Sequence, residues 1–294
     1  MKLKYFAFAF YILCFWGCKK EEPPIDLEST NFSETPTSHV VQPADDLGEA
    51  SGLADSHKQP GLLWSHEDAG SNSELFLLNR QGMIVGKIPT PFGNYDWEDI
   101  AIGPGPISNE TFLYVADIGD NCSCTDIKRI YRFPEPASPT AIINNYEPIA
   151  FRYPDGTYDA ETVLLDPLTK DLYVITKWLG NANVYRLAYP QSTTSVITAE
   201  KVATMTVGND LTGGSISTNG REIIVRGYTA IYYWKRNADE KISDVLAKAP
   251  LKNLPYILEP QGEAVCFDKE GKGYFTLSER RTLPSVNLYF YARK

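Results

Sequence analysis

The sequence has little positive charge, few histidines and no hydrophobic run long enough to cross a membrane. Lys and Arg number 28 against 37 Asp and Glu, which gives a formal net charge of −9. This sign argues against nucleic-acid binding, which needs clustered basic side chains. The three histidines have no paired spacing of the His-Glu-x-x-His kind, so a transition-metal site is not expected. The sequence also lacks a Gly-x-Ser-x-Gly turn and a phosphate-binding glycine loop.

The N-terminal segment is predicted to be an export signal. Two lysines precede an apolar run at residues 5–16, which is shorter than the ~20 residues that span a membrane. Gly17 and Cys18 follow, and a small residue directly before a Cys resembles the bacterial lipoprotein box. The resemblance implies that residues 1–17 are removed and that Cys18 is lipidated. Ordinary secretion with an unmodified Cys18 is the alternative.

The residues after Cys18 indicate where the protein is anchored. The sequence Lys-Lys-Glu-Glu resembles the charged tag that directs some Gram-negative lipoproteins to the outer face of the outer membrane. We therefore expect a lipid-anchored, surface-exposed monomer, with the periplasmic side of the outer membrane as the alternative. Residues 18–40 are rich in Pro, Ser, Thr and Glu, which predicts a flexible tether.

Three cysteines remain after the signal and the lipidated residue are set aside. Cys122 and Cys124 lie in a turn-like segment, and we expect a local disulfide or free thiols there. A zinc site is not expected, because no second pair of Cys or His ligands accompanies them. Cys266 lies in an apolar run and is predicted to be a core residue.

A unit of three short strands recurs five times from residue 45 onward. The first strands begin at intervals of 49 to 63 residues, near Glu49, Glu98, Glu161, Gly213 and Glu263. Each is followed by a strand rich in Val, Ile and Tyr and by a third strand that ends in aromatic residues. A period near 50 with about four strands per unit is typical of propeller blades. The sequence therefore predicts an all-β, five-bladed β-propeller over residues 41–294, with six blades as the alternative.

The fifth unit reaches the end of the sequence at its third strand. Its fourth strand must therefore come from another part of the chain, and residues 38–42, ahead of the first unit, are the predicted donor. Pairing of this N-terminal strand with the last strand would close the ring and remove an open sheet edge.

The start of each first strand carries the predicted metal ligands. The first strand of each blade lines the central channel, so equivalent residues form a ring there. The predicted ring contains Glu49, Glu98, Glu161 and Glu263, with Gly213 or its neighbours Thr212 and Ser215 in the fourth blade. Carboxylates this close repel one another unless they are protonated or bind a cation, and Ca²⁺ is the cation that oxygen ligands favour. The alternative is that each Glu accepts backbone hydrogen bonds from the neighbouring blade.

Further charged residues are predicted at the same face, because the second strands end there. Asp96, Asp117 and Asp159 are candidate general bases, and Lys177 and Arg226 are candidates to neutralise an anionic group. Solvated charges at the rim are the alternative. This set of residues predicts a Ca²⁺-dependent hydrolase of a phosphoester or ester. A surface protein that binds a small anionic ligand or a partner without catalysis is the second hypothesis.

Four segments carry a family resemblance, at residues 64–68, 96–101, 115–121 and 261–265. They resemble exported bacterial β-propeller proteins, esterase-like and phytase-like, most of which have no assigned activity. The arrangement is also similar to the five-bladed calcium-activated nucleotidases (apyrases), whose central Ca²⁺ is held by Glu and Ser residues. This similarity implies Ca²⁺ ligands at Glu98, Glu161 and Glu263, with Glu49 and Ser215 in the remaining places. Calcium-dependent lactonase and esterase-like propellers, usually six-bladed, are similar as well.

Overall fold

The computed structural model describes residues 26, 28–177, 181–208 and 210–294. Cys18 and the predicted signal peptide lie outside these residues. Within the described part of the chain, no helix has the length and apolar character needed to span a membrane.

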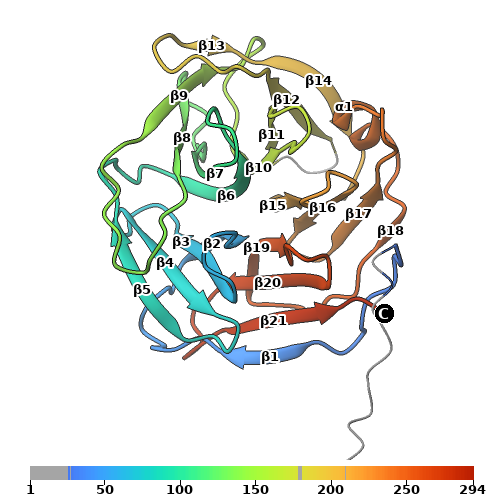
Figure 1. The fold of residues 1–294 in the computed structure, drawn as a ribbon. Helices are drawn as coiled ribbons and strands as arrows, with labels where there is room; N and C mark the ends of the chain where they lie inside the picture. Colours follow the sequence, from blue (N-terminus) through green and yellow to red (C-terminus); the bar gives the residue numbers. More distant parts are fainter. Residues whose placement is uncertain (1–25, 27, 178–180, 209) are drawn as a thin grey trace, which may run out of the picture.

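The described chain forms five β-sheets that surround a common centre, which confirms the five-bladed propeller (Figure 1). Blade 1 contains β2 (Ala50–Asp55), β3 (Leu62–Glu67), β4 (Glu74–Asn79) and β5 (Ile84–Pro89). Blade 2 contains β6 (Trp97–Pro104), β7 (Thr111–Asp117), β8 (Lys128–Pro134), β9 (Glu147–Arg152) and, at its outer edge, β13 (Ile197–Thr198). Blade 3 contains β10 (Ala160–Leu165), β11 (Leu172–Thr176), β12 (Ala182–Leu187) and β14 (Glu200–Met205).

Blades 4 and 5 complete the ring. Blade 4 contains β15 (Leu211–Ile216), β16 (Glu222–Gly227), β17 (Ile231–Lys235) and β18 (Lys252–Asn253), with the short helix α1 (Ile242–Leu246) before β18. Blade 5 contains β19 (Gln261–Phe267), β20 (Gly273–Glu279), β21 (Asn287–Ala292) and β1 (Thr37–Val40). The innermost strands β2, β6, β10, β15 and β19 contact one another in sequence around the centre, and β19 contacts β2.

The hydrophobic core is divided among the five interfaces between blades. The β-branched and aromatic residues that favour strands bury their side chains against the neighbouring sheet, which gives one apolar cluster per interface. Each third strand contributes a buried aromatic ring: Phe76, Tyr131, Tyr185, Tyr233 and Tyr291. Cys266 is buried in the cluster between blades 5 and 1, as expected of a core residue.

The N-terminal strand closes the ring, as the sequence predicts. β1 pairs antiparallel with β21, and Ser38 lies opposite Tyr289. The packed chain begins earlier than residue 41, within the segment expected to be a tether. Phe32 is 3% exposed and packs edge-on against Tyr233 and Tyr274, because its ring fills the interface between blades 4 and 5.

A β-bulge interrupts the start of every innermost strand. In β6, for example, Trp97 pairs with Asp117 and Asp99 pairs with Ala116, so that Glu98 has no partner across the ladder. Three other strands have the same break, at Glu161, Thr212 and Glu263, and in β2 the irregularity spans Ser51 and Gly52, with Ser51 at the equivalent position. A bulge re-aims the side chain of the extra residue. Five equivalent side chains are therefore singled out at one end of the channel.

Candidate functional site

The bulged residues form the centre of a group of carboxylates at one end of the channel. We call Asp68, Asp96, Glu98, Asp159, Glu161 and Glu263 the acidic cluster. Carboxylate oxygens of Asp68, Asp96 and Glu98 lie within 4.8 Å of one another, and so do those of Glu98, Asp159 and Glu161. Glu98 belongs to both groups, so these five carboxylates form one continuous set.

The structure places Glu98, Glu161 and Glu263 in this ring, selects Thr212 among the three candidates of the fourth blade, and replaces Glu49 by Ser51. Glu98, Glu161 and Glu263 are buried at their bulges. Glu49 is exposed and precedes the bulge of its blade, where Ser51 takes the ring position. Ser215 lies three residues beyond Thr212, further along the channel, and its hydroxyl accepts the backbone N–H of Phe267. The difference arises because the bulge, and not the first acidic residue, determines which side chain points inward.

The two hydroxyl residues of the ring bind neighbouring backbone. Ser51 Oγ donates to the carbonyl of Glu98 at 2.6 Å, and Thr212 Oγ1 donates to the carbonyl of Gly262 at 2.8 Å. Each bond joins one blade to the next. Ser51 and Thr212 therefore hold adjacent bulges together, in addition to their positions beside the carboxylates.

Few hydrogen-bond donors reach the Glu side chains of the ring. Lys177 Nζ forms an ion pair with Glu161, and Gln261 Nε2 donates to Glu263 Oε1 at 2.8 Å. Glu263 Oε2 is buried without a partner. Among the described residues, no protein donor reaches the carboxylate of Glu98. Among the residues that the structure describes, none of these three side chains makes the backbone hydrogen bonds expected in the alternative interpretation.

Burial and mutual repulsion shift the pKa values of these carboxyls upward. Burial, followed by the charge of Glu161, raises the pKa of Glu98 well above its usual value, and burial with the charge of Glu263 does the same for Glu161. The pKa of Asp96 rises to about 6, chiefly by burial and then by the charges of neighbouring aspartates. Burial raises the pKa of Glu263 to about 7. Burial and repulsion therefore favour the protonated forms of Glu98, Glu161 and Glu263 when no cation balances them.

Asp99 is a central residue that the sequence analysis did not single out. It is completely buried, and its carboxylate accepts the backbone N–H groups of Ile100, Val163 and Gly214. Asp99 thus joins blades 2, 3 and 4 immediately beyond the bulge. Asp99 directly follows Glu98 in the sequence. Only the strand register decides that Asp99 binds backbone N–H groups while Glu98 belongs to the acidic cluster.

The other end of the channel holds a cavity of about 390 Å³. Its lining is mixed, with apolar residues such as Leu53, Ile100 and Val163 beside polar ones such as Ser217 and Lys269. Asp55 also lines it, and burial raises the pKa of this carboxyl to about 6. Asp99 lies between the acidic cluster and this cavity, because its acceptor bonds reach residues that line the cavity.

Two of the predicted site residues make hydrogen bonds that support the fold. Arg226 is completely buried and donates to the carbonyl of Ala264, to Tyr256 Oη and to Glu259, so it joins blade 4 to blade 5. It cannot contact a ligand at the face, because its guanidinium lies beneath the surface. Asp117 Oδ1 accepts the backbone N–H of Asp96 at 2.9 Å and therefore positions Asp96.

Lys177, Asp96 and Asp159 do reach the cluster. Lys177 is paired with Glu161 and lies over the ring of Tyr228, 5.7 Å from its centroid. Asp96 and Asp159 are partly exposed, and their oxygens approach those of the ring residues. Of the two, Asp159 accepts a backbone hydrogen bond from Asp120 at 2.8 Å.

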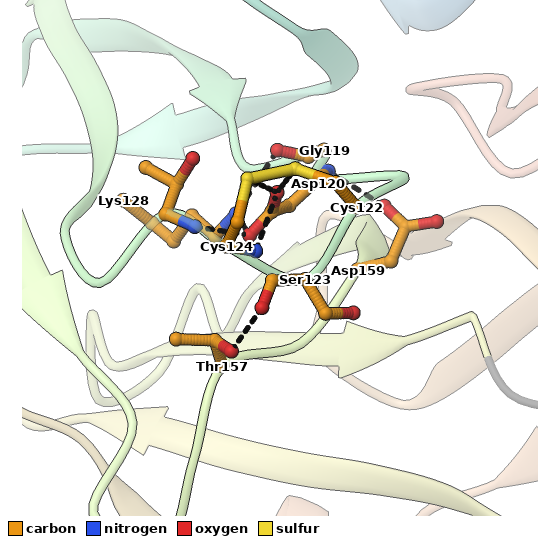
Figure 2. Close-up of a disulfide and its surroundings, with 9 residues drawn as sticks. Gly119, Asp120, Cys122, Ser123, Cys124, Lys128, Thr157 and Asp159 are labelled. Atoms are coloured by element: carbon orange, nitrogen blue, oxygen red, sulfur yellow. Dashed lines mark hydrogen bonds and ion pairs between the residues drawn. A yellow bond between two sulfur atoms is a disulfide. The ribbon is translucent and has the colours of Figure 1, made fainter.

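Cys122 and Cys124 form a disulfide close to the cluster, which decides between the bridge and the free thiols expected from the sequence (Figure 2). Because each sulfur is bonded to the other, this pair offers no thiolate to a metal. The bridge lies in the loop that begins at Gly119. A side chain at Gly119 would collide with Glu98, since a Cβ there would lie 2.2 Å from Glu98 Oε1.

Comparison with known proteins adds a likeness of fold. No family model matches the sequence, and no curated protein matches it. Among solved structures, a luciferin-regenerating enzyme matches with a TM-score of 0.49 and 11% identity, over 88% of this chain and 95% of that chain. At this TM-score and identity the likeness carries no argument about this chain.

The acidic cluster offers hard oxygen ligands, some buried and some partly exposed. Such ligands suit divalent cations of the Ca²⁺ or Mg²⁺ type, and the cluster contains neither His nor Cys ligands that would favour a softer metal. These acidic groups could therefore hold a metal ion.

Proposed function

We propose that the acidic cluster binds Ca²⁺ and that the protein uses the bound cation to hydrolyse an ester or phosphoester. The observation that carries this proposal is the position of Glu98, whose carboxylate belongs to two groups of closely spaced oxygens and receives no protein hydrogen bond from the described residues. Glu263 Oε2 is buried without a hydrogen-bond partner, so a nearby positive charge would stabilise this oxygen as well. One bound cation would compensate several of these charges at once.

Ca²⁺ is preferred over Mg²⁺ because of the shape of the donor set. Ca²⁺ accepts six to eight oxygen ligands in flexible geometry, whereas Mg²⁺ demands near-octahedral geometry and retains its waters. The two overlapping groups of the cluster supply carboxylates from three blades, and Glu263 adds one from a fourth. Ca²⁺ is larger than Mg²⁺ and tolerates more varied ligand geometry, so it suits carboxylates spread in this way.

For hydrolysis, Asp96 is the strongest candidate base. It is half-buried, its pKa is raised to about 6, and among the described residues its carboxylate accepts no hydrogen bond. A base with a pKa near the working pH removes a proton from water most effectively. The cation would polarise the ester or phosphoryl oxygen. Asp117 and Asp159 are weaker candidates, because each accepts a backbone N–H.

A surface protein that binds a ligand or partner without catalysis is the second candidate. The burial of Arg226 and the pairing of Lys177 with Glu161 favour it, because neither predicted cation is free to neutralise charge that develops in a reaction. In both cases we propose attachment to the outer membrane through a lipid on Cys18. The N-terminal sequence supports this attachment, and mass spectrometry of the membrane-extracted protein tests it.

The experiment is a Ca²⁺ titration of the full chain in detergent after treatment with a chelator. We expect stoichiometric binding that is weakened at least tenfold in Glu98→Gln and unchanged in Glu49→Gln, whose side chain is exposed outside the ring. Absence of Ca²⁺ binding contradicts the proposal. The loaded protein is then tested against nucleotides, other phosphoesters and lactones, and turnover that survives Glu98→Gln contradicts the hydrolase mechanism.

A further inference from the structure

One loop supports the acidic cluster through its backbone. We call residues 119–125, between β7 and β8, the disulfide loop. The N–H of Gly119 donates to the carbonyl of Asp96 at 3.2 Å, and the N–H of Asp120 donates to Asp159 Oδ1 at 2.8 Å. Gly119 also lies directly against Glu98. The disulfide loop therefore contacts Asp96 and Glu98 of blade 2 and Asp159 of blade 3.

The position of Asp120 depends on the turn that follows it. Its carboxylate accepts the N–H of Cys124 at 3.1 Å and that of Thr125 at 2.8 Å. The same carboxylate pairs with Lys128 at 2.9 Å, and Lys128 also donates to the carbonyl of Gly119 at 3.0 Å. The side chains of Asp120 and Lys128 are each 2% exposed. Figure 2 shows these contacts gathered around the bridge, with Asp159 beside them.

The disulfide holds this turn in place and is open to solvent. It joins residues two apart, and the residue between them, Ser123, has a φ of 49°, in the left-handed region that a non-glycine residue rarely adopts. Cys122 and Cys124 are both exposed, so a thiol can reach the bridge. Without the bridge, we expect Ser123 to leave this conformation and the N–H groups that Asp120 accepts to move with it.

We propose that the Cys122–Cys124 disulfide is a redox-sensitive clamp on the cation site, and that its reduction weakens cation binding. This inference rests on the proposed function, since the site it regulates is the acidic cluster. The reductant is a dithiol. It transfers two electrons and two protons, so the S–S bond becomes two thiols and the dithiol becomes a disulfide. The loosened turn then no longer fixes the Asp120 N–H that orients Asp159.

The test compares Ca²⁺ binding by the oxidised and reduced full chain in detergent. The protein is reduced with dithiothreitol, freed of it under argon and titrated with Ca²⁺ by calorimetry. We expect the reduced form to bind about ten- to a hundredfold more weakly, the usual effect of losing a residue that orients a metal ligand. The Cys122→Ser/Cys124→Ser variant should bind like the reduced form and should not respond to dithiothreitol. Because it retains the other cysteines, such a result assigns the effect to this bridge. Ser123→Ala, which keeps the bridge, is the matched control and should behave like the oxidised parent.

The outcomes separate the two proposals. Equal Ca²⁺ affinity in both redox forms overturns the clamp and leaves the proposed function intact. Absence of Ca²⁺ binding in either form overturns the proposed function, and the clamp falls with it. Hydrogen exchange of the amides of Asp120, Cys124 and Thr125 gives a readout without cation. We expect faster exchange after reduction, and unchanged exchange overturns the clamp.

Discussion

Asp99 in blade 2 accepts the backbone N–H of Val163 in blade 3 at 3.0 Å, within the channel and one residue beyond the bulge at Glu98. The same carboxylate also accepts N–H groups of Ile100 and Gly214. Within the described part of the chain, two neighbouring acidic residues therefore have opposite environments, one with three backbone donors and one with none. The first contributes to the closure of the ring, and the second is available to a cation.

Asp99→Ala should destabilise the fold. The substitution leaves three buried N–H groups without their acceptor, and each such group costs about 1–3 kcal/mol. We expect the free energy of unfolding in urea to fall by about 3 kcal/mol or more, with a smaller loss for Asp99→Asn, which keeps an oxygen acceptor. Equal unfolding midpoints for the parent and the alanine variant would mean that water or a local shift replaces the carboxylate.

Lys177→Met should strengthen cation binding while it weakens the cation-free protein. Lys177 and the cation compete for Glu161, so removing the lysine leaves that carboxylate to the cation. We expect about tenfold tighter Ca²⁺ binding in calorimetry. In the presence of chelator, the melting temperature should drop, because Glu161 is left buried without its positive partner. Lys248→Met, which removes an exposed ion pair elsewhere, is the control. Weaker Ca²⁺ binding in Lys177→Met would contradict competition.

Stability should depend on pH in opposite ways with and without cation. The pKa values of Asp96, Glu263 and Glu279 rise to about 6, 7 and 8, with burial as the largest cause, so the folded protein binds protons more tightly than the unfolded chain. Their contribution to stability is therefore full near pH 4 and is lost as the pH rises through these values. With chelator, we expect a lower melting temperature at pH 8 than at pH 5. Added Ca²⁺ should raise the melting temperature more at pH 8, because binding displaces protons at lower pH. A Ca²⁺-induced shift that is equal at both pH values would contradict this linkage.

Arg226→Met should affect folding and not ligand recognition. Arg226 and Glu259 are 2.9 Å apart, with side chains 0% and 1% exposed. Removing one partner of such a pair costs about 3–5 kcal/mol, because the other charge stays buried. We expect this loss in urea unfolding and unchanged Ca²⁺ affinity in the protein that remains folded. Arg281→Met, which removes a largely exposed side chain, should cost under about 1 kcal/mol. If Arg226→Met left stability unchanged but abolished ligand binding, Arg226 would belong to the site.

The blades could be predicted from the sequence because their signal is local. Runs such as 172–176 consist of β-branched and aromatic residues and coincide with β11. The same regularity predicted Glu98, Glu161 and Glu263, since each begins a similar strand. The donor strand was predicted from a count of strands in the last unit, and its pairing with β21 confirms it.

The remaining site residues could not be predicted because they depend on register and on distant partners. A bulge shifts the inward-facing position by one residue, and nothing in the sequence around Glu49 and Ser51 marks where it falls. The burial of Arg226 depends on Glu259, 33 residues later in the chain. The prediction that Arg226 lies at the ligand-binding face rested on its charge. Its hydrogen bonds to blade 5 instead keep its side chain buried.

The closure of the ring by β1 has a mechanical consequence. A chain anchored through Cys18, as proposed, would transmit any pull from the membrane to the N-terminal end of the described domain. Ahead of β1, the pull meets Phe32, held between blades 4 and 5, and the carbonyl of Ser29, which Arg293 near the C-terminus binds. In an anchored chain these contacts would take up the force before the β1–β21 hydrogen bonds do. Arg293, near the C-terminus, would then protect the strand pairing that closes the ring.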